Sequence, residues 1–597
     1  MSRTTLSERG DARMADGDGL DTGTWGGLRR ALPWVAFVVA AGSGALLAVG
    51  AFLGLYVRPT SDDWCALWKA RDMGALGITA DFYRTQNGRV TNAFVTGLLY
   101  SDGMRGPKLL PALLVVALVS GLFLLGRAAL RSLRRATRPG GGPAEPPAVL
   151  LVAAAALVSA LLFFAGTRSY QVLLWAPATI SHTLPSVIGL WTVLVAVRAA
   201  RSGLRWARTA AVGSALLIGA ALGMLSEPFT LVGGLFAVTV GVLCLPRLGW
   251  ARTRYVSTWC AAACLGLLGG LTLLYTSPGA RWRRAQNPQE PMSAAQIGET
   301  FHDWWRLWQT VGGQWAYLGA VAVGVLLGLA LAATGPRREG LAPNGTGPRQ
   351  DDGRTPVDGG TPRNEGRTPV DGGTPRNEGR TPVDGGTPRN DGPPPGNDGG
   401  TPPDGDAPRP PRDRADRRAS SGPALPPRTL FRVVVLLPLP LIALASLAVV
   451  LGLRSGYGDV GWTYGRTWTS FLLPLLLVLC AYGAWGGHLL GRRLLTPGRP
   501  AGRAAALVTA GAVAVGSAAA LVQPVYTLTT DTVVRAAAWD RQNARIRQEV
   551  AAGARDVAYG PLLIGGLTEP LFASTYARDW AAQCTAKYYR VDRVHRP

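Results

Sequence analysis

The chain has 597 residues, of which 48% are hydrophobic and only 16% are charged. The hydrophobic residues come in blocks long enough to cross a lipid bilayer, which excludes a string of soluble domains and predicts a polytopic membrane protein. The net charge of +24 does not indicate a nucleic-acid partner, because most of the excess lies in short segments between these blocks and no aromatic-basic binding module is present.

The first hydrophobic block, residues 31–57, is longer than the apolar region of a secretory signal and ends in charged sequence. It therefore predicts a retained signal anchor. With about 20 apolar residues for each crossing, the sequence predicts an all-α fold with about eleven transmembrane helices. The predicted spans are residues 31–57, 109–126, 148–166, 184–199, 209–226, 229–246, 256–275, 315–334, 430–453, 468–487 and 504–523. The two spans beside the SEPFT sequence, residues 226–230, could also form one re-entrant unit. Every later loop would then lie on the other side of the membrane.

Arginine-rich segments between the blocks predict the orientation. Residues 127–138, 198–208, 247–254 and 488–499 contain many arginines and little acid, and with this span count they all fall on one side. Cytoplasmic loops carry such an excess of basic residues. We therefore predict that the N-terminus is inside, that a long first loop at residues 58–108 is extracytoplasmic, and that the C-terminal segment is extracytoplasmic as well.

Composition divides the chain into five regions. Residues 335–429 are rich in Gly, Pro, Arg and Asp, and they contain a 13-residue repeat, GRTPVDGGTPRNE, that occurs twice and returns a third time with a changed end. A repeat without an apolar face builds no packed core, so this region is predicted to be a disordered cytoplasmic linker, or alternatively a binding segment for a cytoplasmic partner. The other regions are a disordered cytoplasmic tail (1–30), a membrane block of about eight spans (31–334), a three-span block (430–523) and a small folded cap (524–597).

Two of the six cysteines, Cys65 and Cys584, fall outside the predicted spans and on the same, extracytoplasmic side. That compartment permits disulfide bonds. We predict that the two cysteines pair and tie the cap to the first outer loop. Two unpaired thiols remain the alternative, because the sequence does not show their geometry.

Two adjacent carboxylates, Asp62 and Asp63, stand where the chain leaves the first span. Adjacent carboxylates repel, so one of them could have a raised pKa, or a divalent cation such as Mg²⁺ or Mn²⁺ could hold both. Either arrangement suits a general base that takes a proton from a hydroxyl group. The alternative is structural, because Ser-Asp-Asp before an apolar run is also a helix-capping signal.

The other predicted outer segments contain polar residues that suit an anionic ligand. The candidates are Asn87, Arg89, Trp175, His182, Glu227, Arg281 and Arg466. Arginine forks donate two parallel hydrogen bonds to phosphate oxygens, so they could hold a lipid phosphate. Glu227 lies beside two apolar spans, where an ionisable residue is costly and indicates a function. The alternative for each arginine is ordinary anionic lipid or a salt bridge to a loop acid.

The order of these motifs resembles the lipid-linked membrane glycosyltransferases of the GT-C superfamily, and more closely a bacterial multi-span GT-C-like family. That family is marked by an acidic pair after the first span, an NGR sequence, a Trp-to-Pro turn, an intramembrane glutamate, a PG-x-x-R sequence and a terminal YY pair. The corresponding residues are 62–63, 87–89, 175–185, 227, 278–281 and 588–589, with the arginine of the fifth motif one position nearer than usual. His182 departs from the pattern, because the family is expected to carry an aromatic residue there.

The resemblance implies an inverting glycosyltransferase of the bacterial plasma membrane. Its donor would be a sugar on a polyprenyl phosphate, and its acceptor an envelope glycan or glycoprotein on the outer face. Asp62 or Asp63 would be the base or the metal ligand, Arg89, Arg281 and Arg466 would hold the phosphate, and Glu227 would orient the acceptor.

Two other classes of protein remain open. A transporter or flippase for lipid-linked glycans is one, although its ionisable residues should run through the membrane interior, whereas here they gather at the predicted outer ends of the spans. A structural envelope protein is the other. The four histidines show no metal spacing, and the sequence contains no P-loop or G-x-S-x-G motif, so nucleotide-driven pumps and serine or zinc hydrolases lack support.

Overall fold

The structure is a computed structural model of the chain. It describes residues 19–137, 148–166, 168–248, 253–286, 293–333, 433, 435–494, 500–564, 567–568 and 579–597. The predicted linker at 335–429 and residues 1–18 of the predicted tail lie outside the described residues. The chain before and after that linker forms one compact unit, and everything below concerns this unit.

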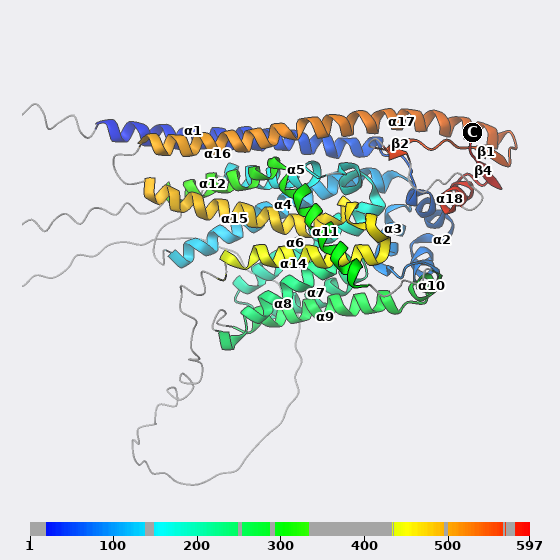
Figure 1. The fold of residues 1–597 in the computed structure, drawn as a ribbon, viewed down its shortest axis with the longest axis horizontal. Coiled ribbons are helices and arrows are strands. Elements are labelled where there is room, and N and C mark those ends of the chain that lie inside the picture. The colour runs from blue at the N-terminus through cyan, green and yellow to red at the C-terminus, as the bar shows by residue number, and fades with distance from the viewer. Residues whose placement is uncertain are drawn as a thin grey trace, which may run out of the picture. The chain divides into compact units, whose positions relative to one another are not determined.

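Each predicted span contains a helix, and together these helices form the bundle in Figure 1. They are α1 (Gly19–Leu53), α4 (Arg105–Thr137), α5 (Ala148–Phe164), α6 (Ala176–Arg201), α7 (Arg205–Gly223), α8 (Glu227–Leu243), α9 (Tyr255–Thr276), α12 (Leu318–Ala333), α14 (Pro438–Tyr457), α15 (Thr469–Leu494) and α16 (Pro500–Ala520). By length and composition, nine helices in the described part of the chain could cross a membrane, whereas α5 and α8 are shorter apolar helices. The all-α, multi-pass class is therefore supported, and the number of crossings stays a prediction.

Two helix boundaries differ from the sequence prediction. The first helix begins at Gly19, so residues 19–30 are helical and not part of a disordered tail. The fourth predicted span begins at Ala176, so the sequence expected to be a turn forms the first two turns of α6. Pro177 is compatible with this, because the first helical positions have no intrahelical partner for the N–H group that proline lacks.

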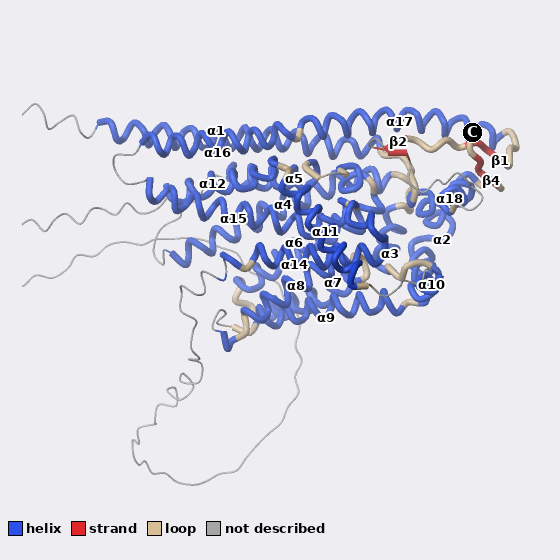
Figure 2. The backbone as a smooth tube through the Cα atoms, viewed as in Figure 1, coloured by secondary structure: helices blue, strands red, loops and turns tan. Residues whose placement is uncertain are grey.

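Further helices and short turns connect the bundle and extend it at one end. The helices are α2 (Asp62–Thr85), α3 (Val90–Leu99), α10 (Pro278–Gln286), α11 (Ala294–Gly312), α17 (Val522–Ala551) and α18 (Trp580–Tyr589), with short turns η1 (Gly54–Tyr56), η2 (Tyr170–Leu174), η3 (Pro246–Leu248), η4 (Trp315–Tyr317), η5 (Gly458–Thr463) and η6 (Gly465–Trp468). The predicted first outer loop is thus mostly helical, and it bends inside α2 at Gly74, where φ is +67°. The strands in Figure 2 are confined to the C-terminal region.

Helix α5 is the centre of the bundle. It contacts α1, α4, α12, α15 and α16, and Leu157, Leu161 and Phe163 have no exposed surface. A helix that is apolar on every side and packed against neighbours on every side is a core helix. Burial by protein explains how a helix of 17 residues fits into the bundle although it is shorter than a typical crossing.

Helices α12 and α15 approach closely because glycines face each other across their interface. A Cβ atom on Gly328 of α12 would lie 2.1 Å from the carbonyl oxygen of Ala484 and 2.5 Å from the nitrogen of His488. Helices in membranes associate through such small residues, which let the backbones approach.

We expect Gly328→Ala to destabilise the bundle by about 1–3 kcal/mol, because the added methyl group overpacks this interface. A Cβ atom on Gly486 of α15 would meet nothing within 4 Å, so Gly486→Ala is the matched control and should be neutral or slightly stabilising. Unfolding midpoints of the purified variants in detergent measure the difference. Equal midpoints for the two variants would contradict this account of the interface.

The C-terminal cap consists of α17, α18 and four short strands. Helix α17 follows α16 after a single residue, Leu521, and ends at Ala551, shortly before Gly553, whose φ is +96°. Strands β1 (Asp556–Ala558) and β4 (Arg593–His595) pair in parallel, and β2 (Leu563–Ile564) and β3 (Leu567–Thr568) are antiparallel.

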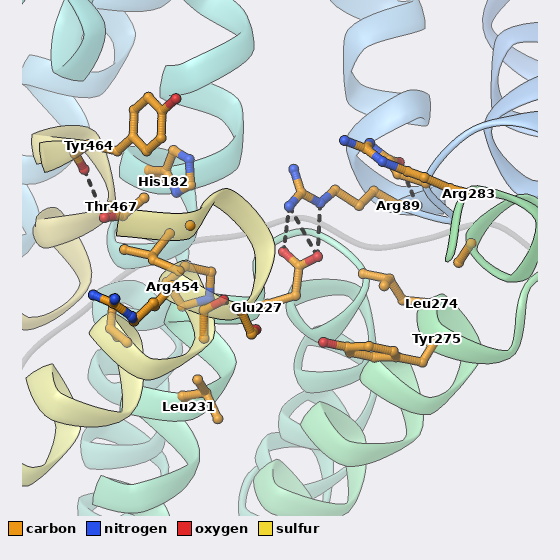
Figure 3. A pocket seen from close by; sticks show the side chains of 18 of the residues that line it. Arg89, His182, Glu227, Leu231, Leu274, Tyr275, Arg283, Arg454, Tyr464 and Thr467 are labelled. Atoms are coloured by element: carbon orange, nitrogen blue, oxygen red, sulfur yellow. Dashed lines mark hydrogen bonds and ion pairs between the residues drawn. The ribbon is translucent and has the colours of Figure 1, made fainter. Parts of the chain in front are cut away.

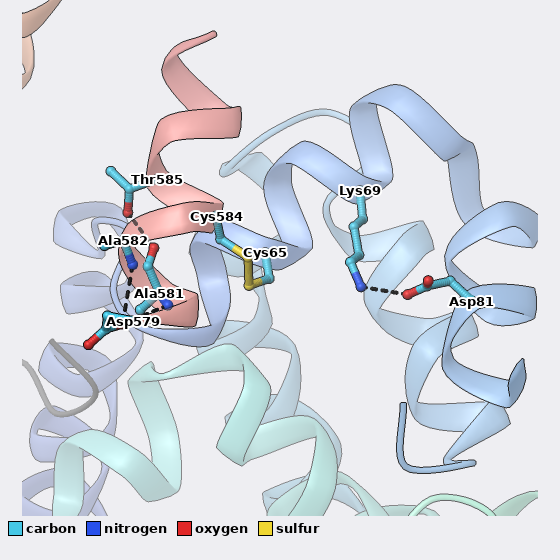
Figure 4. The surroundings of a disulfide bond; sticks show 8 residues. All are labelled: Cys65, Lys69, Asp81, Asp579, Ala581, Ala582, Cys584 and Thr585. Carbon is cyan, nitrogen blue, oxygen red and sulfur yellow. Dashed lines mark hydrogen bonds and ion pairs between the residues drawn. A yellow bond between two sulfur atoms is a disulfide. The ribbon is translucent and has the colours of Figure 1, made fainter. Parts of the chain in front are cut away.

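The core of the cap closes around a residue of the first outer loop. Trp64 of α2 has no exposed surface and lies against the rings of Trp539, Tyr559 and Tyr589, with ring centroids 6.2, 5.6 and 5.9 Å away. Beside it, Cys65 and Cys584 are joined by a disulfide bond, which is the pairing predicted from their shared compartment (Figure 4). The cap and the first outer loop therefore share one hydrophobic core.

Candidate functional site

A cavity of about 810 Å³ lies at the end of the bundle where α6 and α8 begin and where α9 and α14 end (Figure 3). Its lining is rich in arginine and also contains apolar side chains. The polar and charged residues include Asn87, Arg89, His182, Glu227, Arg283, Arg284, Arg454, Tyr464 and Arg466, and the apolar residues include Leu231, Leu274, Val449 and Leu453. Five of the predicted site residues, distant in sequence, therefore meet in one cavity.

Helix α6 relates the cavity to one of the arginine-rich segments, residues 198–208. It carries His182 near its start and Arg201 at its end. Their separation along the axis is roughly 28 Å at 1.5 Å per residue, which is close to the thickness of the hydrocarbon core of a bilayer. A positive-inside orientation would place the cavity at the extracytoplasmic surface.

Arg89 and Glu227 point toward each other across the cavity wall (Figure 3). The guanidinium donates from Nε and Nη2 to Oε1 of Glu227 at 3.1 and 3.0 Å, and Nη2 lies 2.8 Å from Oε2. Each side chain keeps about a quarter of its surface accessible, at 24% and 26%. Glu227 thus has a positive partner that lowers the cost of its position beside the apolar helices, and it holds Arg89 in a fixed orientation.

Two glycines explain why the segments 85–89 and 277–279 interlock. Gly88 has φ of +73°, and a Cβ atom there would lie 2.1 Å from Oγ of Ser277. A Cβ atom on Gly279 would lie 2.6 Å from the nitrogen of Gln86. Any larger side chain at either position would push apart the segments that carry Arg89 and Arg283.

Arg466 lies between aromatic rings. Its guanidinium carbon is 5.3 Å from the ring centroid of Trp175 and 4.8 Å from that of Tyr464. Such cation–π contacts attract the guanidinium and fix its plane. Close by, His182 lines the cavity, and its Nδ1 is buried without a hydrogen-bond partner in the described part of the chain.

Asp62 is the member of the acidic pair whose charge interacts with the cavity arginines. It keeps an exposed surface, unlike Asp63. Partial burial raises the pKa of its carboxyl above the ordinary value, and the positive charges of Arg466, Arg89 and Arg283 act in the opposite direction. Water at the exposed surface limits how far burial can raise this pKa. Asp62 is therefore an exposed carboxylate in the electrostatic field of three arginines that line the cavity, while it is not itself one of the lining residues.

Asp63 is enclosed and fully engaged. It is 1% exposed, the hydroxyl of Tyr100 donates to its Oδ1, and the backbone N–H of Thr60 donates to its Oδ2 at 3.0 Å. Burial raises the pKa of Asp63 to about 7, although both hydrogen bonds act to lower it. The contact with Thr60 lies just before the start of α2, so Asp63 fits the structural alternative better than the catalytic one.

The raised pKa of Asp63 predicts a pH dependence of stability. Because the folded protein holds this proton up to about pH 7 and an unfolded chain releases it near the ordinary value of 3.8, stability should fall as the pH rises between these values. Asp63→Asn should remove this slope. Unfolding midpoints measured from pH 4 to pH 8 test it, and Asp102→Asn, at an exposed position of the same outer loop, should keep the wild-type slope.

Two predicted details of the site need correction. Arg281 is exposed and is not among the residues that line the cavity, whereas Arg283 and Arg284 on the same short helix do line it. Arg454 was not predicted at all. It lines the cavity at the end of α14 and forms ion pairs with Glu299 and Asp303 of α11.

The acidic pair is not part of a larger group of metal ligands among the described residues. Within the described ranges, no group of three or more His, Cys, Asp or Glu side chains has a geometry that could hold a metal ion. Both oxygens of Asp63 already accept hydrogen bonds. Of the pair, Asp62 is therefore the carboxylate that could bind a cation carried by a ligand. The predicted Mg²⁺ or Mn²⁺ remains a prediction.

No protein-family model, curated protein or solved structure matches this chain. The residues alone define the class as a multi-pass membrane protein with an arginine-rich cavity at one end of its bundle. Such a cavity suits an anionic group attached to an apolar chain, because its lining offers both charge-assisted hydrogen bonds and hydrophobic contact.

Proposed function

We propose that this protein is an integral-membrane glycosyltransferase that moves a sugar from a polyprenyl phosphate to a hydroxyl group of an envelope glycan or glycoprotein. The observation that carries the proposal is the exposed carboxylate of Asp62, whose charge interacts with Arg89, Arg283 and Arg466 of a cavity that is also lined by apolar side chains. The arginines would hold the donor phosphate, and the apolar side chains would contact the first part of the polyprenyl chain.

In the proposed reaction, Asp62 accepts the proton of the acceptor hydroxyl group while the oxygen of that hydroxyl group bonds to the anomeric carbon of the sugar. The bond from that carbon to the phosphate oxygen breaks, and its electron pair stays on the lipid phosphate. Arg466 and Arg283 would stabilise the charge that develops there. A single displacement of this kind inverts the configuration at the sugar. The raised pKa of Asp62 suits a general base, because a more basic carboxylate takes the proton more readily.

The test is turnover of a panel of radiolabelled polyprenyl-phosphate sugars by the purified protein in lipid vesicles, with and without EDTA, Mg²⁺ or Mn²⁺. Transfer to an added acceptor, or slow hydrolysis of the donor, supports the proposal. Movement of labelled lipid across the bilayer without any chemical change would instead support the transporter alternative and overturn the enzymatic one.

A further inference from the structure

Two residues just before Ser61, Arg58 and Pro59, are held by the C-terminal cap. Arg535 of α17 is only 5% exposed, and its Nη2 and Nη1 donate to the carbonyl oxygens of Pro59 and Arg58 at 2.8 and 3.2 Å. The side chain of Arg58 in turn donates to both oxygens of Asp540 at 2.7 and 2.9 Å. One helix of the cap thus fixes this segment through both its backbone and its side chain.

The backbone that this helix fixes is strained. Ser61 has φ of +45° and ψ of −114°, a conformation that residues other than glycine rarely adopt. Such strain persists only where the surroundings determine the conformation, and it gathers at functional sites. Because Ser61 directly precedes Asp62, its backbone angles set the direction in which the Asp62 side chain leaves the chain.

The cap also holds the other side of Asp62. Trp64 is buried in the cap core and Cys65 is bonded to Cys584. Further along α2, Arg71 donates to the carbonyl oxygens of Lys587 and Tyr588 at 3.1 and 2.9 Å. The cap therefore contacts the chain before and after Asp62, while no described residue of the cap lines the cavity.

We infer that Arg535 is a positioning residue of the site: it holds the strained turn at Ser61 and with it the position of Asp62. This inference rests on the proposed function for the role of Asp62, but the position of that residue can be tested separately. A displacement of about 1 Å at a reacting group can cost about 100-fold in rate.

The experiment compares Arg535→Gln with wild type in two measurements. The first is amide hydrogen exchange without ligand, in which the N–H groups of Asp63 and Trp64 report the turn, because they donate to the carbonyl oxygens of Thr60 and Ser61 at 2.8 and 3.2 Å. The second is turnover of the donor panel. We expect at least about tenfold faster exchange at these two amides, unchanged exchange in α5, and about 100-fold lower kcat with KM for the donor within about twofold.

Two variants on the same helix sharpen the comparison. Arg541→Gln removes an exposed arginine of α17 and should behave as wild type. Arg535→Lys should recover part of the loss, because an ammonium group can still donate to the two carbonyl oxygens. If Arg535→Gln does not fold, Asp540→Asn is measured instead, because it releases only the side chain of Arg58. We expect it to increase exchange at the two amides and to lower kcat, both by less than Arg535→Gln would.

Unchanged exchange at the Asp63 and Trp64 amides would overturn the inference, and so would faster exchange with wild-type turnover. Equally faster amide exchange in α5 would show that Arg535 has a general structural role, and this result would also overturn the inference. If the wild type turns over no donor, the glycosyltransferase proposal fails. The exchange measurement uses no substrate, so it still decides whether Arg535 fixes the position of Asp62.

Discussion

Asp62→Asn is expected to lower kcat for sugar transfer by about 1,000-fold, because a positioned general base contributes about 10²–10⁴-fold. The amide has the size of the carboxylate but cannot accept the proton. Donor affinity should stay equal or increase, since the substitution removes a negative charge beside Arg89, Arg283 and Arg466. Initial rates with a radiolabelled donor, together with donor binding by the same sample, measure both effects.

Asp63→Asn is the matched control for this result. Its carboxylate is enclosed by Tyr100 and the Thr60 amide, so it does not reach the cavity, and transfer should stay within about tenfold of wild type. The two variants differ by one position in the chain and carry the same chemical change. Wild-type turnover by folded Asp62→Asn would remove the general base from the mechanism, and a larger loss at Asp63 would reverse the assignment within the pair.

Much of the fold could be predicted, because the length of a hydrophobic block indicates a crossing helix without any knowledge of its neighbours. The helix in the block at 31–57 was found in this way. Boundaries were less certain where a helix continues beyond the apolar residues, as at the start of α1 and of α6. The lateral arrangement was not predictable, because a helix such as α5 is apolar on every side and its pattern does not say which partners cover it.

The candidate site was predicted in its composition more than in its geometry. Arg89 and Glu227 were both singled out, yet nothing in the sequence showed that they form an ion pair. Arg281 was chosen over Arg283 because short motifs do not fix which face of a nine-residue helix turns to the cavity, and residues two apart lie on different faces. The signal that could have found Arg454 is its position at the end of a span, where an arginine is rarely without a polar partner.

Arg466→Gln is expected to weaken binding of a polyprenyl phosphate by about 10- to 100-fold, since a hydrogen bond to a charged group contributes about 1.5–3 kcal/mol. Trp175 and Tyr464 hold the guanidinium plane, so its donors are in place before the phosphate arrives. The positive charge of Arg466 also lowers the pKa of Asp62. Its loss should raise that pKa and move the acid limb of the pH–rate profile to higher pH, because the base must be deprotonated to act.

Two other arginine variants separate charge from geometry. Arg466→Lys keeps the positive charge but loses the planar fork, so it should lose part of the affinity while the acid limb stays in place. Arg306 also stacks on a tryptophan, with its guanidinium 4.8 Å from the ring of Trp462, but it is not among the cavity-lining residues, so Arg306→Gln should bind the lipid phosphate as wild type does. Equal losses at Arg466 and Arg306 would indicate general attraction of an anionic lipid to the basic surface. A loss confined to Arg466 would place the phosphate in the cavity, within reach of Asp62, as the proposed mechanism requires.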